Sequence, residues 1–424
     1  FGGSAYGSVR AVIPFWPDDI TFKLASITIS FEFRLDKGEV YASIEIYVGF
    51  PVFSTFFEDV TWSFNPPPIL ATQFGNTLRL NMGVDAASRQ YVNTTDGAES
   101  FTVTHISQSG SDETVRVSAF GFTKDFSGVR TILVNDAGNG DDTVRFYGIQ
   151  SAISANGGVG NDTIYVGPTN PNNAGVATLY GGSGNDSLQG GNANDTIYGG
   201  DGNDTISGGE GDDKLYGEAG NDTINGEAGA DTLEGGSGND TLSGGSENDT
   251  YIFKSGWGSD TVNETGNASN DVFDLSALAA SLTFALGAGN VYQVTDGGNV
   301  VTTSGLDVEK FIGGTGADVF NVTKTGGNEV TLQGLASSDT YNVTFGSLVG
   351  AVKVDDAGNS TDNDYLNVTT TSATAVRVSD STGDSKITQG TQEVNYDPGI
   401  NNVNRLRLTA LNAPVSFSGG VGGA

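Results

Sequence analysis

A nine-residue repeat is the feature of this sequence that most constrains its fold. Between residues 181 and 252 the chain reads as eight consecutive units, from GGSGNDSLQ to GGSENDTYI. Each unit has Gly at its first position and Asp at its sixth. The eighth position is apolar in every unit: Leu188, Ile197, Ile206, Leu215, Ile224, Leu233, Leu242 and Tyr251. A flexible glycine-rich linker would not keep this register, so the run predicts a regular repeat structure.

Stereochemistry assigns a role to each position of the unit. Glycines at positions one, two and four admit positive φ, so the first six residues can form a tight turn. The last three residues then form a short strand whose apolar middle residue faces inward. One unit of nine residues supplies half a turn, so two units complete a coil of 18. We therefore predict a parallel β-roll over residues 181–252.

Stacked coils place the sixth-position aspartates above one another along each edge of the roll. Such a column of carboxylates repels itself unless cations lie between successive members. Carboxylate and carbonyl oxygens are hard ligands, which favour calcium over zinc or copper. The predicted calcium ligands are Asp186, Asp195, Asp204, Asp213, Asp222, Asp231, Asp240 and Asp249. Backbone carbonyls of the first-position glycines are predicted to assist: Gly181, Gly190, Gly199, Gly208, Gly217, Gly226 and Gly235.

The repeat run resembles a known family. It matches the pattern G-G-x-G-x-D-x-U-x of the RTX, or haemolysin-type, calcium-binding nonapeptide-repeat proteins, over about a sixth of the chain. The resemblance implies several bound calcium ions and export to the cell exterior by a one-step type I route. It also implies that surface-layer, filament and adhesin proteins are among the relatives.

Composition supports a fold that depends on cations. The net charge is −32 and cysteine is absent, so neither disulfides nor thiolate metal sites can stabilise the chain. A surface this acidic repels nucleic acids and anionic lipids, which argues against nucleic-acid binding. No apolar run approaches the roughly 20 residues of a transmembrane segment. The sequence begins at Phe1, so we expect a processed product or a piece of a longer protein.

The repeat run should fold only with calcium. Residues 181–252 carry 15 Asp or Glu and one Lys, a net charge of −14, and a segment this polar should be disordered alone. About six ions, each at ten times its dissociation constant, would contribute roughly 8 kcal/mol, comparable to the stability of a whole domain. Extracellular calcium modules bind at roughly 0.1 to 1 mM, so folding should occur outside the cell.

Weaker units flank the run. GGVGNDTIY at 157–165 adds Asp162 to the predicted ligands, and AGNGDDTVR at 137–145 adds Asp142 as an isolated unit. An insertion at 166–180 separates the first of these from the run. Short apolar runs recur across residues 75–180 and 253–424, which favours a looser β-helix continuing the roll. A series of β-sandwich modules is the alternative, chiefly for 253–424.

Residues 1–74 differ in kind, with 16 of the chain's 40 aromatic residues and no repeat unit. Residues 20–35 alternate as a strand with a bulge at Ala25 and Ser26. Asp36-Lys37-Gly38 predicts a hairpin turn into a return strand over 40–48. We interpret this region as a cap for the solenoid, and the alternative is a strand edge that pairs with a neighbouring subunit. The predicted fold class is all-β: a parallel β-roll and β-helix solenoid with calcium-binding turns.

Catalytic motifs are missing from the sequence. A single histidine cannot supply H-E-x-x-H, and no G-x-S-x-G occurs, so the zinc protease and the lipase of other relatives are excluded. His105 lies in an alternating strand, FTVTHIS, and we expect a structural role for it. Paired carboxylates acting on a carbohydrate remain as the one catalytic alternative.

Two functions follow from these observations. The favoured one is a secreted, calcium-binding structural protein of the bacterial cell surface that polymerises through its N-terminal region and is not an enzyme. A surface-layer subunit, a filament, a sheath and an adhesin segment all fit this description, and a cell-surface polysaccharide is a further candidate partner. The alternative is an exported polysaccharide-modifying enzyme, an epimerase or lyase, in which the roll serves folding and secretion.

Overall fold

The computed structural model describes residues 28–34, 39–45, 61–64, 68–89, 96–167, 175–264, 270–355, 363–370, 376–380, 385–396, 405–410 and 415–419. The chain forms two compact units, residues 1–67 and 68–424. In the first unit, β1 (Thr28–Arg34) and β3 (Thr61–Phe64) each pair antiparallel with β2 (Glu39–Glu45). The pairing of β1 with β2 agrees with the predicted hairpin. Its turn and the predicted bulge lie outside the described residues.

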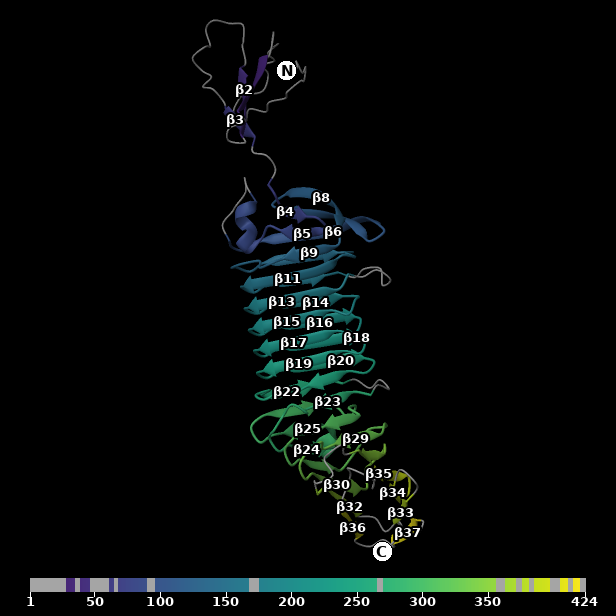
Figure 1. Cartoon of the computed structure of the whole chain (residues 1–424). Coiled ribbons are helices and arrows are strands. Elements are labelled where there is room, and N and C mark those ends of the chain that lie inside the picture. Colours follow the sequence, from purple (N-terminus) through teal and green to yellow (C-terminus); the bar gives the residue numbers. More distant parts are fainter. Residues whose placement is uncertain are drawn as a thin grey trace, which may run out of the picture. The chain divides into compact units, whose positions relative to one another are not determined.

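The second unit is a solenoid whose coils stack one on another (Figure 1). Its first sheet contains β6 (Ser100–Ser109), β7 (Asp112–Ala119), β8 (Phe122–Val129), β10 (Thr143–Tyr147), β12 (Thr163–Val166), β14 (Ser187–Gly191), β16 (Thr205–Glu210), β18 (Thr223–Ala228), β20 (Thr241–Ser246), β22 (Ser259–Val262), β24 (Thr283–Leu286), β25 (Tyr292–Thr295), β26 (Val300–Thr303), β28 (Val319–Val322), β30 (Thr340–Phe345), β32 (Tyr365–Thr370) and β36 (Arg405–Ala410). Its second sheet contains β4 (Ala71–Phe74), β5 (Thr77–Leu80), β9 (Thr131–Val134), β11 (Ala152–Val159), β13 (Ala177–Ser183), β15 (Thr196–Asp201), β17 (Lys214–Ala219), β19 (Thr232–Ser237), β21 (Thr250–Ile252), β23 (Val272–Asp274), β27 (Lys310–Ile312), β29 (Val330–Gln333), β31 (Val352–Val354), β33 (Val376–Asp380), β34 (Ser385–Gln389), β35 (Gln392–Tyr396) and β37 (Val415–Gly419).

Strand register confirms the coil of two repeat units. In the first sheet Leu188 lies opposite Ile206, and Ile206 lies opposite Ile224, each 18 residues further on. In the second sheet Ile197 and Leu215 pair in the same way. All eight eighth-position residues are at most 2% exposed, so they form a continuous core between the two sheets. Burial of this apolar row is the main driving force for packing the sheets together.

Parallel pairing continues beyond the run on both sides. Upstream, β10 pairs with β12 and β12 with β14, while downstream β28 pairs with β30 and β30 with β32. The parallel strands of 253–424 therefore form further coils of the solenoid rather than sandwich modules, and β25 and β34 pair antiparallel with their neighbours in these coils. Ala71–Phe74, which we assigned by sequence to the N-terminal region, forms β4 of the second sheet.

Antiparallel strands close the upstream end of the solenoid. The hairpin of β4 and β5 joins the second sheet through β9, and the meander of β6, β7 and β8 joins the first sheet through β10. The described helices are the short 3₁₀ turns η1 (Gly83–Ser88) and η2 (Ala288–Asn290). Neither of these helices in the described part of the chain has the length or apolar character needed to cross a bilayer.

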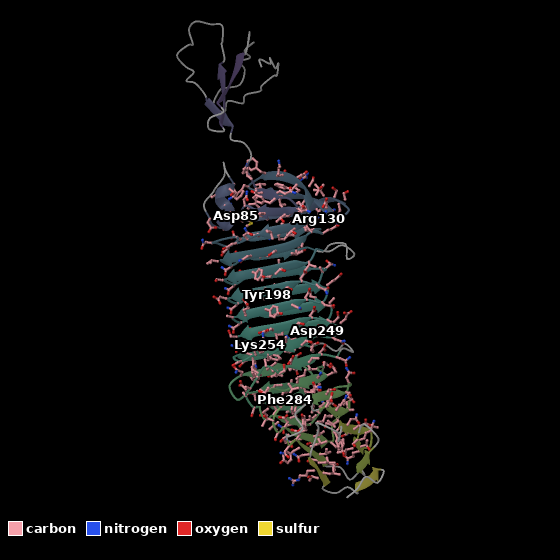
Figure 2. The ribbon with its side chains drawn as sticks, in the orientation of Figure 1. Asp85, Arg130, Tyr198, Asp249, Lys254 and Phe284 are labelled. Carbon is pink, nitrogen blue, oxygen red and sulfur yellow. The ribbon has the colours of Figure 1, made fainter. Side chains whose placement is uncertain are left out.

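An outward row of tyrosines marks one face of the second sheet. The rings of Tyr180 and Tyr198 stack at 5.0 Å between centroids, and those of Tyr198 and Tyr216 at 4.9 Å. These residues occupy the ninth position of successive coils, so the 18-residue register brings the rings face to face. Tyr198 is labelled in Figure 2. Each stacked pair adds about 1 kcal/mol or less to the coil-to-coil contact.

The turns need glycine at positions where the next coil approaches closely. Gly202 has a φ of +130°, and a Cβ built there would lie 1.8 Å from the carbonyl oxygen of Gly184 in the preceding coil. Glutamate replaces glycine at the second position of two units, Glu218 and Glu227, and at the fourth position of one, Glu247, with φ between 74° and 83°. A non-glycine residue in this conformation costs roughly 1 kcal/mol or more, so these turns store strain.

We expect Gly202→Ala to destabilise the calcium-loaded protein by about 3 kcal/mol, because both the φ angle and the neighbouring carbonyl oppose a Cβ. Thermal unfolding in millimolar calcium measures the loss. Gly298→Ala is the control, since a Cβ there meets nothing closer than the Asp296 carboxylate at 3.6 Å. Equal stability of the two variants would contradict the close stacking of the turns.

Candidate metal centre

Each sixth-position aspartate uses one carboxylate oxygen to bind the preceding coil. Asp204 Oδ1 accepts the backbone N–H of Asp186 at 2.7 Å, and Asp222 Oδ1 accepts the N–H of Asp204 at 2.8 Å. On the other edge, Asp213 Oδ1 accepts the N–H of Asp195 at 2.7 Å. A charged acceptor makes this hydrogen bond stronger than a neutral one. The aspartates therefore form two columns that connect coil to coil.

The first column lies at the start of the first-sheet strands and the second column at the start of the second-sheet strands. The first consists of Asp142, Asp162, Asp186, Asp204, Asp222, Asp240 and Asp260, linked by these N–H···Oδ1 bonds. The second consists of Asp195, Asp213, Asp231, Asp249 and Asp271. All twelve are at most 3% exposed.

The second carboxylate oxygen, Oδ2, is the unusual feature of the columns. It is buried and has no hydrogen-bond partner in eleven aspartates: Asp142, Asp162, Asp186, Asp195, Asp204, Asp213, Asp222, Asp231, Asp240, Asp249 and Asp260. A buried carboxylate oxygen without a donor is costly, so each of these atoms calls for a positive partner. The set includes all ten aspartates predicted as ligands from the sequence.

Carbonyl oxygens of the next coil lie beside these unpaired atoms. A Cβ built on Gly181 would lie 2.3 Å from Asp186 Oδ2 and 2.4 Å from the Gly199 carbonyl oxygen. The same pairing of an aspartate Oδ2 with a first-position carbonyl recurs in the turns, with the carbonyls of Gly181, Gly208, Gly217, Gly226, Gly235 and Gly244. At Gly190, a Cβ would lie 2.7 Å from Asp195 Oδ2 and 2.4 Å from the Gly208 carbonyl oxygen. Glycine at position one keeps each space open.

This donor set fits calcium. The oxygens are hard, they come from carboxylate and backbone carbonyl together, and they repeat at every coil. Among the described residues no three acidic, histidine or cysteine side chains converge on one point, so a cation here would take much of its coordination from carbonyls. Bound calcium would neutralise the unpaired Oδ2 atoms and hold successive turns together.

The structure corrects the picture of the flanking units. Asp142, expected to lie in an isolated unit, is the first aspartate of the first column, because its N–H donates to Asp162 Oδ1 at 2.7 Å. The predicted insertion at 166–180 contains the start of β13, a strand of the second sheet in which Ala177 takes the place of the aspartate. Its N–H donates to Asp195 Oδ1 at 2.6 Å, so Asp195 begins the second column.

Two column members were missed by sequence reasoning. Asp260 belongs to SGWGSDTVN at 255–263, which keeps Gly at positions two and four and Val at position eight. Only the first-position Gly is lost, so the pattern could have revealed it. Asp271 follows a longer turn, and only the NDVF run at 270–273 marks it. Glu309 then accepts the N–H of Asp271 with Oε2 at 3.0 Å and extends the second column.

The upstream end of the first column carries a cation of its own. Glu99 donates its N–H to Asp142 Oδ1 at 2.6 Å, so it occupies the place of a column member. Its Oε1 pairs with the buried guanidinium of Arg89, which also lies 5.2 Å from the centre of the Phe120 ring. Sequence reasoning missed this pair, because Arg89 comes from a turn far from any repeat unit.

His105 lies away from both columns. Its Nδ1 is 2.7 Å from Oε1 of the buried Glu113. Glu113 Oε2 accepts the N–H of Ser151 at 2.8 Å and its hydroxyl at 2.6 Å. These bonds tie β7 to the start of β11, which is consistent with the structural role expected for His105.

Burial raises the pKa of the column aspartates. It rises to about 8 for Asp142 and Asp213, to about 7 for Asp186, Asp195, Asp222, Asp249 and Asp260, and to about 6 for Asp162 and Asp231. The pKa of Asp204 and Asp240 is also raised by burial. Without a cation, the buried charges are therefore costly near neutral pH.

We expect the calcium-free roll to become less stable as pH rises from 5 to 8. The folded aspartates keep protons up to about pH 6 to 8, whereas an unfolded chain loses them near pH 4. The folded state therefore binds more protons in this window, and its stability falls with pH. Calcium needs the deprotonated form, so its affinity should rise over the same window with release of protons.

Circular dichroism melts in chelator and calorimetric titrations in buffers of different ionisation enthalpy measure these two opposite trends. Stability that rises with pH in chelator, or calcium binding without proton release, would contradict the assignment of the buried carboxylates.

We expect Asp213→Asn to raise the calcium concentration needed for folding roughly tenfold, about 1.4 kcal/mol. The amide oxygen can still accept the Asp195 N–H, but an NH₂ group replaces the unpaired Oδ2 and repels a cation. Calcium-free stability should not fall, because a buried charge is removed. Asp212→Asn, which makes the same charge change at an exposed neighbour, is the control for a calcium titration followed by circular dichroism. Equal midpoints for the two variants would count against Asp213 as a ligand.

Comparison with known proteins identifies the repeats. A family model described as the RTX calcium-binding nonapeptide repeat (4 copies) matches residues 154–170, 173–206, 180–215, 198–233, 216–251 and 229–262. Among solved structures, the crystal structure of extracellular lipase LipA from Serratia marcescens matches with 15% sequence identity and a TM-score of 0.16. The match covers 59% of this chain and 43% of the lipase chain, so this chain spans less than half of the lipase. Among curated proteins, none matches the chain.

The TM-score is too low for the lipase to say anything about function. The family match covers ten of the eleven column aspartates whose Oδ2 lacks a partner, from Asp162 to Asp260. The repeat units within residues 154–262 are therefore RTX calcium-binding nonapeptide repeats, as the sequence pattern of 181–252 predicted.

Proposed function

We propose that this chain is a secreted structural protein that folds on calcium outside the cell and then assembles with copies of itself. The observation that carries the first half is the series of eleven buried Oδ2 atoms without a partner. Without a cation, the buried carboxylate charges destabilise the folded roll. With calcium bound, the same Oδ2 atoms hold successive coils together. Calcium is scarce in the cytoplasm and abundant outside, so the roll would remain export-competent until it leaves the cell. A type I route fits this order of events.

The N-terminal sheet supports the proposal of self-assembly. Within the described residues of the first unit, β1 and β3 each pair only with β2, so each has one free edge. Strand edges are the usual sites at which another chain adds a strand. A net charge of −32 opposes the approach of like subunits, and calcium bound in the roll would lower this repulsion. Surface layers, filaments, sheaths and adhesin segments are all compatible with such contacts.

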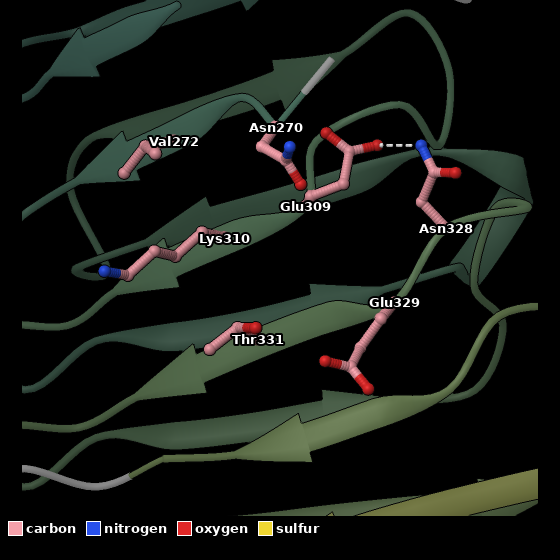
Figure 3. Close-up of a pocket in the computed structure, with 7 residues that line it drawn as sticks. All are labelled: Asn270, Val272, Glu309, Lys310, Asn328, Glu329 and Thr331. Atoms are coloured by element: carbon pink, nitrogen blue, oxygen red, sulfur yellow. Dashed lines mark hydrogen bonds between the residues drawn. The ribbon is translucent and has the colours of Figure 1, made fainter. Parts of the chain in front are cut away.

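A structural role is favoured over catalysis by the way acidic side chains are used. A polysaccharide-modifying enzyme would need a pair of accessible carboxylates in a cleft. A pocket on the second sheet does contain Glu309 and Glu329, from the starts of β27 and β29 (Figure 3). However, Glu309 accepts a hydrogen bond from Asn328 at 2.9 Å, and Glu329 accepts one from Asn395 at 3.2 Å. Both carboxylates are thus engaged in hydrogen bonds with asparagine side chains, which favours a structural role for them. The exported polysaccharide-modifying enzyme is the alternative to the structural protein.

Electron microscopy of the purified chain tests the assembly. We expect ordered polymers in millimolar calcium and dispersed particles in chelator, because calcium first folds the roll and then reduces repulsion between subunits. Deleting residues 1–67, which form a separate compact unit, should leave a calcium-folding solenoid that does not polymerise. The alternative function predicts the opposite pattern: a monomer in calcium that alters an acidic polysaccharide. A truncated chain that forms the same polymer would rule out assembly through the N-terminal sheet.

A further inference from the structure

The second aspartate column ends in a way that differs from every repeat above it. The first position of each repeat unit in 181–252 is glycine, but the unit that follows Asp260 begins with Glu264. The eighth position is Leu or Ile in the other seven units, but Tyr251 in the last one. Both side chains are buried, Glu264 at 4% exposed and Tyr251 at 0%. Tyr251 and Glu264, the two departures from the repeat pattern, are therefore both inside the solenoid and come from successive coils.

We propose that the calcium site at Asp249 differs from the other repeat sites, because the buried Glu264 side chain supplies a second carboxylate there and Tyr251 orients it. This proposal rests on the proposed calcium-dependent folding. The chemistry is that of a hard divalent cation held by two carboxylates from successive coils, together with backbone carbonyls.

Gly244 is the point around which the groups of this site gather. A Cβ built on Gly244 would lie 2.1 Å from Asp249 Oδ2, which is buried and has no hydrogen-bond partner. The N–H of Gly244 donates to the Tyr251 hydroxyl at 2.6 Å, and that hydroxyl donates to Glu264 Oε1. The unpaired Asp249 oxygen and the Glu264 carboxylate therefore both lie beside one glycine. Figure 2 labels Asp249 on this part of the solenoid.

Within the described part of the chain, neither the Asp249 nor the Glu264 carboxylate forms a salt bridge with a lysine, arginine or histidine. The Asp271 and Asp249 carboxylates both act on Glu264 electrostatically, and Glu309 does so more weakly. All four are at most 6% exposed. Glu264 accepts a hydrogen bond from the Tyr251 hydroxyl and Glu309 accepts one from the Asn328 amide, and both of these side-chain donors are neutral. The charge of buried carboxylates at this density has to be offset, either by protonation or by a cation between them.

Tyr251 acts as a positioning residue for Glu264. A hydroxyl that donates to a ligating carboxylate fixes its orientation. A similar placement recurs at Tyr341, whose hydroxyl oxygen would lie 2.6 Å from a Cβ built on Gly334, next to Asp339 Oδ2 at 2.1 Å. An eighth-position tyrosine therefore brings its hydroxyl to the first-position glycine in both coils. At Tyr251 the hydroxyl meets a glutamate from the following coil.

Glu309 is a buried glutamate of the same region whose two carboxylate oxygens both have hydrogen-bond donors within the protein. Its Oε2 accepts the Asp271 N–H at 3.0 Å, and its Oε1 accepts the Asn328 amide at 2.9 Å (Figure 3). Further along, Asp318 Oδ2 accepts the Gly314 N–H at 2.9 Å. These side chains need no cation. Asp249 is thus the last aspartate of the second column whose Oδ2 is buried without a hydrogen-bond donor. The Glu264 carboxylate lies beside it.

The test counts calcium bound per full-length chain, by equilibrium dialysis with metal analysis, in Glu264→Gln and Glu309→Gln. We expect Glu264→Gln to bind one ion fewer than the parent protein, because it keeps the side-chain volume and a hydrogen-bond acceptor but loses the charge. Glu309→Gln should bind the parent number. Tyr251→Phe should also keep that number but weaken one site about tenfold in a calcium titration.

Three results separate the hypotheses. If the parent protein binds no calcium, the proposed function fails and the Asp249–Glu264 site fails with it. If the parent binds several ions and Glu264→Gln binds the same number with the same affinities, only the Asp249–Glu264 site is overturned, and Glu264 is a structural residue. If Glu264→Gln does not fold, Tyr251→Phe decides: an unchanged titration overturns the site, and one weakened ion supports it.

Discussion

The solenoid depends on the way each buried aspartate divides its two oxygens. Oδ1 accepts a backbone N–H from the preceding coil, as between Asp186 and Asp204, and this bond fixes the spacing of the turns. The geometry of that bond leaves Oδ2 facing the interior with no donor of its own. One residue type therefore supplies a stabilising bond and a destabilising charge at every coil. The balance between them depends on whether a cation is present.

The regular part of this arrangement could be predicted from the sequence because it is local. A period of nine residues fixes a coil of 18, and the inward position of Leu188 or Ile197 follows from strand alternation. The aspartates follow from the same period. What could not be predicted is the hydrogen bond made by Oδ1, since the repeat pattern gives the position of the carboxylate but not the direction of its two oxygens.

The ends of the columns were beyond sequence reasoning for a different reason. Arg89 meets Glu99 across a turn that has no repeat pattern, and Glu309 joins Asp271 across 38 residues that include β24, β25 and β26. These contacts depend on loops whose lengths vary from coil to coil, so no fixed spacing reveals them. Ala177 is a further example, because it occupies the place of an aspartate in its coil. A search for the aspartate of the repeat pattern does not find such a coil.

The two kinds of end imply that parts of the solenoid differ in what they need in order to fold. At the upstream end the Arg89 guanidinium carries a permanent positive charge. It neutralises the Glu99 carboxylate, so this end of the first column needs no calcium. Downstream of the roll, Glu309 and Asp318 find donors in Asn328 and Gly314. Between them, from Asp142 to Asp260, eleven Oδ2 atoms have no donor within the protein, so on the proposed function an exchangeable ion offsets their charge. On the proposed function, calcium therefore acts on the middle of a continuous solenoid, and the coils that flank it present strand edges on which the roll can form once calcium binds.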